Sequence, residues 1–298
     1  MSEIDFFRFL VGLAILFYAT YTDVKTRLVS NILWLLMVSI GLAILEINLF
    51  FLSAPIQFYL TPIVAIIFFL TIFSEGELFI DYVSKKKNNI LVFSLNFFAI
   101  LLLLYQYTIA GFSEIFISLL LMYFMLFLSY FFYRTGLLQG GADAKALMSL
   151  SILVPFYPHI LSYPIIQLPE IMELTFPFAL VILFNSVIIL IFLPIFFIIY
   201  NISKMDIGLP MFYGYKVDID SVKKRFIWLA EKIVDGKRIY VFFPSKEDTD
   251  EELEKLKKIG IKKVWVTPQI PFMLPMFIGF IVSFFIGNIM IWLIGLVI

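Results

Sequence analysis

The chain has 298 residues, of which 62% are hydrophobic, 18% aromatic and only 15% charged, and its formal net charge is zero. With a mean hydropathy of +1.02, it carries more apolar surface than a water-soluble domain of this length can bury, so the composition predicts a polytopic membrane protein. The apolar runs are continuous rather than alternating, which favours membrane-spanning helices over a β-barrel. The balanced charge argues against a nucleic-acid-binding protein.

The residue types present also restrict the chemistry. The sequence has no Cys, which excludes a disulfide framework, a thiolate metal site and a cysteine nucleophile. Its single His, His159, argues against a histidine-rich metal site or a Ser–His triad. We therefore expect no metal and no other cofactor. The N-terminal segment MSEIDFFRFL is acidic ahead of its apolar run, unlike a secretory signal peptide, so we expect the first helix to be retained.

Eight segments are apolar for long enough to cross a bilayer as helices, which takes roughly 17 to 25 residues. The predicted helices cover residues 5–22, 32–52, 56–73, 90–110, 115–133, 144–162, 176–200 and 272–297. The sixth is the weakest prediction, because Pro155 and Pro158 interrupt it. Only three residues separate the second segment from the third, so these two could instead form one re-entrant unit.

The distribution of basic residues predicts how these helices are oriented. Of the 22 Lys and Arg, 21 lie in loops that would share one side of the membrane, and the exception is Arg8 near the start of the first helix. The loops on the opposite side carry no Lys or Arg and contain Glu114, Glu170 and Glu173. We therefore predict a multi-pass protein of the plasma membrane, with both termini outside and the basic loops in the cytoplasm.

Residues 201–270 form the one long hydrophilic segment and carry 25 of the 44 charged residues. Within it, RIYVFFP (238–244) and KKVWVT (262–267) predict short strands. Between them, residues 250–258 predict a helix that Gly260 would end as a C-cap. The segment therefore predicts a small α/β domain on the cytoplasmic side.

The predicted fold class is an all-α polytopic membrane protein of about eight transmembrane helices, with this α/β domain inserted before the last helix. The expected domains are residues 1–200 in the membrane, 201–270 as the soluble domain, and 271–298 as the final transmembrane helix.

Four aspartates lie outside the hydrophilic segment, and two of them attract attention. Asp5 lies on the outer side, and Asp81 lies in a hydrated, charged loop. Asp23 ends the first helix and Asp143 begins the sixth, so both are predicted at the cytoplasmic boundary. Because an ionisable carboxyl at membrane depth is costly, it is usually kept for a function.

Two carboxyl groups that meet can hydrolyse a peptide bond together. The ionised carboxyl takes a proton from water, while the protonated one donates to the carbonyl oxygen. Gly140 and Gly141, just before Asp143, have no Cβ, so they permit unusual backbone conformations and let a substrate backbone approach the carboxyl. The pattern therefore predicts catalysis by Asp23 and Asp143.

Each aspartate also has a structural explanation. Asp23 could pair with Lys25 or Arg27 at the helix end, and Asp143 could be an N-cap. The shared side of the membrane and the Gly-Gly-Ala-Asp sequence favour catalysis for the two together. Lys145 and Arg27 either tune the carboxyl groups or simply anchor the cytoplasmic loops, and the second explanation is the simpler one.

Three features resemble a known family: Asp23 followed by basic residues, the segment GGADAK (140–145), and WVTPQIPFMLP (265–275) ahead of a last helix. They resemble type IV prepilin peptidases, and most of all the archaeal preflagellin peptidases, which are GxGD membrane aspartyl proteases. Ala142 replaces the second Gly of that motif, and residues 50–110 resemble an insertion relative to the shorter family members.

The resemblance implies an aspartic endopeptidase that acts on archaellin or type IV pilin precursors, which carry a short basic leader ahead of an apolar helix. It implies cleavage at the cytoplasmic membrane boundary and leaves the oligomeric state open. The acidic residues Glu247, Asp248, Asp250 and Glu251 could attract such a leader, or could complement the dipole of the helix that they begin. Cleavage rates of a charge-neutralised variant at several salt concentrations would distinguish these two explanations.

Three other functions remain as alternatives. A proton-coupled transporter also uses carboxyl groups, but usually near the bilayer midplane and often with repeat symmetry. A non-catalytic assembly scaffold would tolerate the loss of both aspartates. A relative of presenilin or signal-peptide peptidase would carry its aspartates on neighbouring helices late in the chain.

Overall fold

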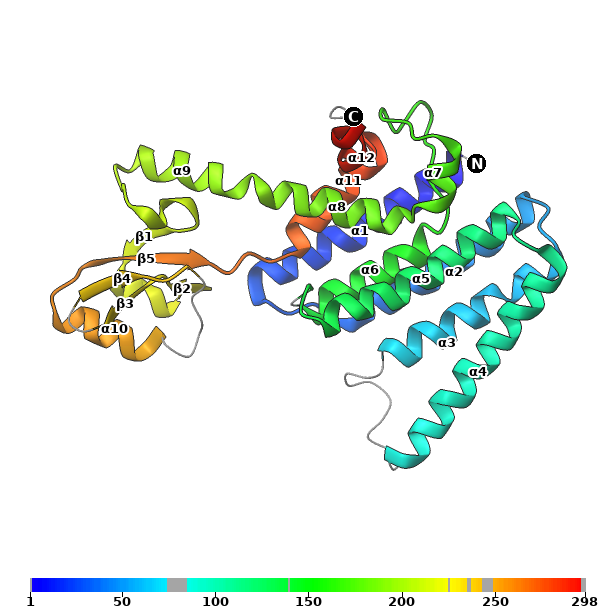
Figure 1. Cartoon of the computed structure of the whole chain (residues 1–298), viewed down its shortest axis with the longest axis horizontal. Coiled ribbons are helices and arrows are strands. Elements are labelled where there is room, and N and C mark those ends of the chain that lie inside the picture. The colour runs from blue at the N-terminus through cyan, green and yellow to red at the C-terminus, as the bar shows by residue number, and fades with distance from the viewer. Residues whose placement is uncertain are drawn as a thin grey trace. The chain divides into compact units, whose positions relative to one another are not determined.

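The computed structural model describes residues 2–73, 85–138, 140–224, 226–234, 237–242 and 249–295 (Figure 1). The chain divides into two compact units. The first, the helical unit, comprises residues 1–187 and 272–298, and the second, the α/β unit, comprises residues 188–271. The three-domain division expected from the sequence stays a prediction.

The described part of the helical unit consists of helices joined by short loops. Their bounds are α1 Ser2–Thr26, α2 Asn31–Phe51, the 3-10 helix η1 Ile56–Leu60, α3 Thr61–Phe73, α4 Lys85–Ala110, α5 Glu114–Arg134, α6 Gly141–Leu153, α7 Glu170–Thr175, α8 Phe178–Ile191, α11 Met273–Phe285 and α12 Ile289–Gly295.

Five helical segments among the described residues are long and apolar enough to cross a membrane. They are Glu3–Thr26, Asn31–Phe51, Ile90–Ala110, Glu114–Arg134 and Phe178–Ser203, and the apolar helices Ile56–Ile72 and Met273–Phe285 are shorter. The mostly helical architecture is therefore confirmed, with five candidate membrane-spanning helices among the described residues, whereas the count of eight spans is not.

Two predicted spans are shorter than expected. The sixth, 144–162, is helical only to Leu153, because Pro155 disfavours helical backbone at Val154, which has φ −126° and ψ 72°. The eighth, 272–297, is interrupted at Gly287, whose φ of +101° lies in the left-handed region. Proline and glycine thus end these helices before they reach a membrane-spanning length.

The short helix α6 lies inside the helical unit, against α2 and α5 (Figure 1). Glycines on its neighbours permit this close packing. A Cβ added to Gly41 on α2 would lie 2.9 Å from Leu153 Cα, and one added to Gly12 on α1 would lie 3.2 Å from Leu153 Cδ2. The last residue of α6, Leu153, is therefore packed between α1 and α2, which fixes the position of this end of the helix in the helical unit.

Helix α1 also packs along α11. The Phe9 ring of α1 contacts Phe280 and Phe284 of α11, with centroid distances of 5.7 and 5.2 Å. At the other end of the same contact, Thr20 Oγ1 donates a hydrogen bond to the Met273 carbonyl oxygen at 3.1 Å. The start of α11 therefore lies beside the last turns of α1.

The α/β unit contains the helices and strands α9 Leu193–Ser203, η3 Leu209–Phe212, β1 Tyr215–Asp218, η4 Ile219–Lys224, β2 Ile227–Leu229, β3 Glu231–Val234, β4 Lys237–Tyr240, α10 Thr249–Lys258 and β5 Lys263–Pro268. The strands form an antiparallel sheet in the order β1-β5-β2 and a separate β3-β4 hairpin.

The apolar core of this unit lies between the three-stranded sheet and α10, with Val264 and Val266 of β5 packed against Leu253 and Leu256. The two strands and the helix predicted for the segment are confirmed as β4, β5 and α10. Gly260 also has the expected left-handed backbone, with φ +81°. The other three strands, each three or four residues long, were not predicted.

A buried carboxyl ties the two sheets of the α/β unit together. Glu231 on β3 accepts hydrogen bonds from Arg238 Nε at 2.6 Å and from the Trp265 backbone N–H at 2.8 Å. Burial raises the pKa of Glu231, while the Trp265 N–H and the Arg238 guanidinium oppose that rise. This carboxyl has both an opposite charge and a backbone donor, as a buried structural carboxyl requires.

Candidate active site

Asp143 lies in the first turn of α6, three residues after the N-cap Gly140. Its carboxylate accepts a hydrogen bond from the Gly140 backbone N–H, and its own backbone N–H donates to the Gly140 carbonyl oxygen at 3.1 Å. This is the arrangement of a capping box, in which the third helical residue reaches back to the N-cap. Asp143 therefore caps α6, although as the third helical residue rather than as the N-cap expected in the structural alternative.

Gly140 is needed for a different reason from the one expected. Its backbone has φ −94° and ψ 124°, which any residue can adopt, so the expected unusual conformation is wrong at this position. A Cβ at residue 140 would instead collide with the Asp143 carboxyl group, at 2.9 Å from Cγ. Glycine at this position makes room for the acid itself.

Burial and a neighbouring negative charge both act on Asp143. The residue is only 9% exposed, and α6 is not among the five helical segments long enough to span a membrane. Burial raises the pKa of Asp143 from its ordinary 3.8 to about 7, the charge of Asp23 adds to the rise, and the Gly140 N–H opposes it. Asp143 therefore keeps its proton to a much higher pH than an ordinary aspartate does.

Asp23 lies in the last turn of α1 and is half-buried. The helix ends because Arg27, with φ +59°, adopts a left-handed backbone and its N–H returns to the Asp23 carbonyl oxygen at 3.0 Å. A carboxylate is unfavourable at the C-terminus of a helix. Asp23 is instead stabilised by a hydrogen bond from the Met273 backbone N–H, at the start of α11, and by the nearby charge of Arg27.

The structure brings Asp23 and Asp143 together. They are 120 residues apart in the sequence, yet Asp23 is close enough to Asp143 to act on it electrostatically. Two like charges in a partly buried site cannot both ionise easily, so the pair favours holding one proton between them. This is the protonation state that general acid–base hydrolysis by two carboxyl groups requires.

The other motif residues surround this pair. Ala142 is partly buried against the main core, and a Cβ on Gly141 would lie 3.6 Å from the ring of Tyr133, an ordinary contact. Lys145 Nζ donates to Asn31 Oδ1, at the start of α2, at 2.9 Å. Lys145 therefore links α6 to α2, and a tuning role for it or for Arg27 stays a prediction.

The acidic run proposed for leader contacts is only partly described. Glu247 and Asp248 lie outside the described residues, as does the side chain of Asp250, and Glu251 is exposed on α10. The neighbouring Glu252 accepts the Ile233 backbone N–H at 2.8 Å and pairs with Lys255 at 2.7 Å. That carboxyl stabilises the α/β unit, and a leader contact by the others stays a prediction.

Two residues near the pair were not identified from the sequence. The Met273 backbone contributes a donor to Asp23, and the Tyr133 ring lies beside Gly141. A main-chain donor has no side-chain signature, and the one available signal was the segment ahead of the last helix, 265–275, which ends next to Asp23.

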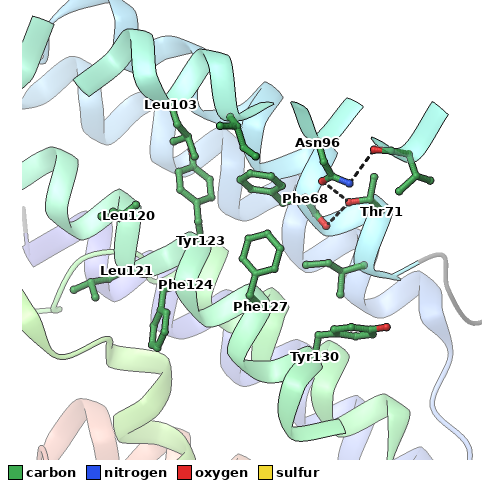
Figure 2. Close-up of a pocket in the computed structure, with 13 residues that line it drawn as sticks. Phe68, Thr71, Asn96, Leu103, Leu120, Leu121, Tyr123, Phe124, Phe127 and Tyr130 are labelled. Atoms are coloured by element: carbon green, nitrogen blue, oxygen red, sulfur yellow. Dashed lines mark hydrogen bonds between the residues drawn. The ribbon is translucent and has the colours of Figure 1, made fainter. Parts of the chain in front are cut away.

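An apolar cavity of the helical unit lies elsewhere. It has a volume of about 770 Å³ and lies between α3, α4 and α5 (Figure 2). Its polar feature is the hydrogen bond from Thr71 Oγ1 to Asn96 Oδ1 at 3.1 Å. No Asp, Glu or His is among the residues that line it: Phe68, Thr71, Ile72, Val92, Asn96, Ile100, Leu103, Leu120, Leu121, Tyr123, Phe124, Phe127 and Tyr130. It therefore offers no carboxyl or imidazole group for acid–base catalysis.

No group of three or more His, Cys, Asp or Glu side chains that could hold a metal ion occurs among the described residues. Two carboxyl groups that share a proton have the chemistry to act as an acid and a base.

Comparison with known proteins gives a consistent set of relatives. A family model described as archaeal peptidase A24 C-terminus type II matches residues 209–289. A preflagellin peptidase of Methanococcus voltae is 29% identical over 217 residues, covering 70% of this chain and 89% of that protein.

Two further relatives carry the same name. The preflagellin peptidase of Methanococcus maripaludis is 26% identical, over 70% of this chain and 89% of its own length. That of Methanocaldococcus jannaschii is 28% identical, over 54% of this chain and 68% of its own length. The segment matched by the family model includes Met273, whose N–H contacts Asp23.

Proposed function

We propose that this chain, which belongs to the archaeal preflagellin peptidases of the A24 peptidases, is a membrane aspartyl endopeptidase that removes the leader peptide from archaellin or type IV pilin-like precursors. Asp23 and Asp143 are its catalytic residues. The observation that supports the proposal is that two carboxyl groups from distant parts of the chain lie near enough to interact electrostatically, and that burial and this interaction raise the pKa of Asp143.

Asp143 acts as the general acid and Asp23 as the general base. A water molecule between them gives one proton to Asp23 as its oxygen attacks the carbonyl carbon of the scissile bond, while Asp143 gives its proton to the carbonyl oxygen. The tetrahedral intermediate then collapses: the C–N bond breaks, the leaving nitrogen takes the proton from Asp23, and a hydroxyl group of the intermediate returns a proton to Asp143 as the new carboxyl group forms. The Met273 N–H and Arg27 favour the negative charge that Asp23 needs as a base.

Cleavage takes place at the cytoplasmic face of the membrane. The basic residues cluster in the loops that would lie on the same side as Asp23 and Asp143, so by the positive-inside rule this side is cytoplasmic. A precursor with a basic leader in the cytoplasm and an apolar helix in the bilayer would present the junction between them at this depth. The α/β unit is then cytoplasmic, and both termini are outside.

The proposal is tested by co-expressing the full chain with leader-bearing archaellin and pilin precursors and scoring leader removal on gels. Asp23→Asn and Asp143→Asn should each lower the cleavage rate by on the order of 10⁴-fold or more. Asparagine can still accept the hydrogen bonds from Met273 and Gly140, so both variants should keep the fold. Glu3→Gln, an exposed acid on the same helix as Asp23, is the matched control and should cleave normally.

Normal processing by both asparagine variants would refute catalysis by the pair and favour the scaffold. Removal of the leader from one precursor class alone would identify the substrate.

A further inference from the structure

A second polar cluster lies at the opposite end of α1 from Asp23. Arg8 is completely buried, and its NH1 group pairs with Asp5 Oδ1 at 3.0 Å. The side-chain amide of Asn48 on α2 also faces Arg8, 3.0 Å from NH2, and its oxygen, when turned to this side, accepts a hydrogen bond from the guanidinium. The Arg8 guanidinium also lies 5.8 Å from the centre of the Phe156 ring. Arg8, the one exception to the sidedness of the basic residues, is thus neutralised inside the helical unit.

Asp5 makes a second contact that leaves its own helix. Its Oδ2 accepts a hydrogen bond from the backbone N–H of His159 at 3.1 Å. His159 follows α6 by way of residues 154–158, and Pro155 and Pro158 stiffen this connector by fixing φ. The carboxylate of Asp5 therefore joins α1 to the chain that continues α6.

The same two segments meet again at the candidate active site. Asp5 and Asp23 lie on α1, about 27 Å apart along the helix axis at 1.5 Å per residue. Asp143 and His159 lie at the two ends of α6 and its connector. Between these ends, Gly12 of α1 packs against Leu153 of α6. The Asp5–His159 bond consequently opposes sliding of α6 along α1.

We propose that Asp5 is a positioning residue for the hydrolysis: by binding the His159 N–H, it fixes the axial register of α6 against α1 and so holds Asp143 within reach of Asp23. This inference rests on the proposed catalytic role of the two aspartates. The cleavage rate should depend strongly on this register, because a misplacement of about 1 Å at a reacting centre can lower a rate by roughly 100-fold.

A purely stabilising role for the ion pair is less well supported by its chemistry. Apolar side chains of similar volume often replace a buried ion pair without loss of stability. An ion pair that also binds a backbone N–H on another segment has a geometric function that such side chains cannot reproduce. The inference therefore concerns the hydrogen bond from His159 rather than the charge of Asp5.

The test compares two double variants of the full-length protein. Both remove the ion pair, but Asp5→Asn/Arg8→Met keeps an oxygen that can accept the His159 N–H, whereas Asp5→Leu/Arg8→Met does not. The leucine variant should lower kcat for leader cleavage by about 10 to 100-fold with KM within about twofold. The asparagine variant should stay within about threefold of the parent in both constants.

Two readouts separate register from stability. Because Asp23 raises the pKa of Asp143, moving the pair apart should shift the alkaline limb of the pH–rate profile to lower pH in the leucine variant alone. Since the chain has no Cys, Asp23→Cys/Asp143→Cys can also be added to each variant and bridged with bismaleimides of graded length. The shortest linker that bridges the pair should change in the leucine variant and not in the asparagine variant.

The cross-linking needs no catalysis, so it measures the register even if Asp23→Asn and Asp143→Asn prove active and the proposed function fails. If the leucine variant does not accumulate in membranes, His159→Pro, which removes the donor, is compared with His159→Ala, which retains it, in both readouts. Equal linker reach and equal pH profiles within these matched pairs would overturn the inference.

Discussion

The two ends of α1 hold carboxyl groups in opposite electrostatic settings. Asp5 is buried beside an arginine and also binds a backbone N–H. Asp23 has the nearby charge of Arg27 and a backbone donor too, but it faces a second carboxyl, Asp143. In the first setting an opposite charge balances the carboxylate, as a structural role requires. Two carboxyl groups close to each other are instead typical of a functional site, where their shared proton takes part in the chemistry.

The α/β unit supports this distinction with an independent case. Glu231 is fully buried, yet it is bound by Arg238 and by the Trp265 N–H. Among the described residues, Asp143 is the Asp or Glu whose pKa rises partly because of another carboxyl. The comparison therefore distinguishes Asp143 and Asp23 as two carboxyl groups that act on each other electrostatically.

The largest decrease in kcat that tests this comparison is expected from a bulkier residue beside Asp143. Gly140→Ala would push a methyl group into the Asp143 carboxyl, at 2.9 Å from Cγ, and should lower kcat by roughly 100-fold through misplacement of the acid. Gly141→Ala is the matched control, because its methyl group would meet the Tyr133 ring at an ordinary 3.6 Å. It should retain activity within about threefold. Equal effects of the two substitutions on leader cleavage would contradict this account of Gly140.

The next effect is the pH dependence. Because the general acid must be protonated and the pKa of Asp143 is about 7, kcat/KM should fall about tenfold per pH unit above neutrality. The folded state holds this proton more tightly than the unfolded chain, whose Asp has a pKa of 3.8. Stability should therefore decrease as the pH rises from about 4 to about 7 and then level off.

Asp143→Asn provides the control for the stability measurement, since asparagine does not titrate. Thermal unfolding in detergent between pH 5 and pH 8 should show a smaller loss of stability with rising pH in this variant than in the parent. Identical pH dependence in the two proteins would mean that Asp143 ionises normally in the folded state.

The smallest effect concerns the two basic residues near the pair. Arg27→Gln removes the charge close to Asp23 and should lower kcat by about three to tenfold, because a single charge–charge interaction at a partly exposed site contributes about 1 kcal/mol. Lys145→Gln, whose ammonium binds Asn31, should change kcat by less than about twofold. A larger decrease in kcat for Lys145→Gln than for Arg27→Gln would show that Lys145, rather than Arg27, balances the negative charge at this end of α1.

Much of this protein follows from local sequence. The continuous apolar runs predict membrane helices, because backbone groups in lipid must be satisfied within each segment, and five such segments are present. Helix ends were less predictable. Pro155 and Gly287 shorten α6 and α11, and the sequence alone does not show how strongly each interrupts a hydrophobic run.

The candidate site divides in the same way. Asp23 and Asp143 stand out in the sequence because both are acids at the ends of apolar helices, predicted on the same side of the membrane. Three other contacts have no such signal in the sequence: the hydrogen bond from Met273 to Asp23, the close approach of Gly140 to Asp143, and the hydrogen bond from His159 to Asp5. Each of them involves a main-chain group, and only the tertiary packing determines which side chain lies next to it.

The order of apolar and charged residues by itself determined the membrane class, the α/β segment and the identity of the two acids, since these depend on composition and short-range periodicity. Only the tertiary structure decided that the two acids interact electrostatically, and that Asp5 and Arg8 form a buried ion pair at the far end of α1. Such contacts are made between helices far apart in the chain, where the register of one helix against another sets which groups come within reach.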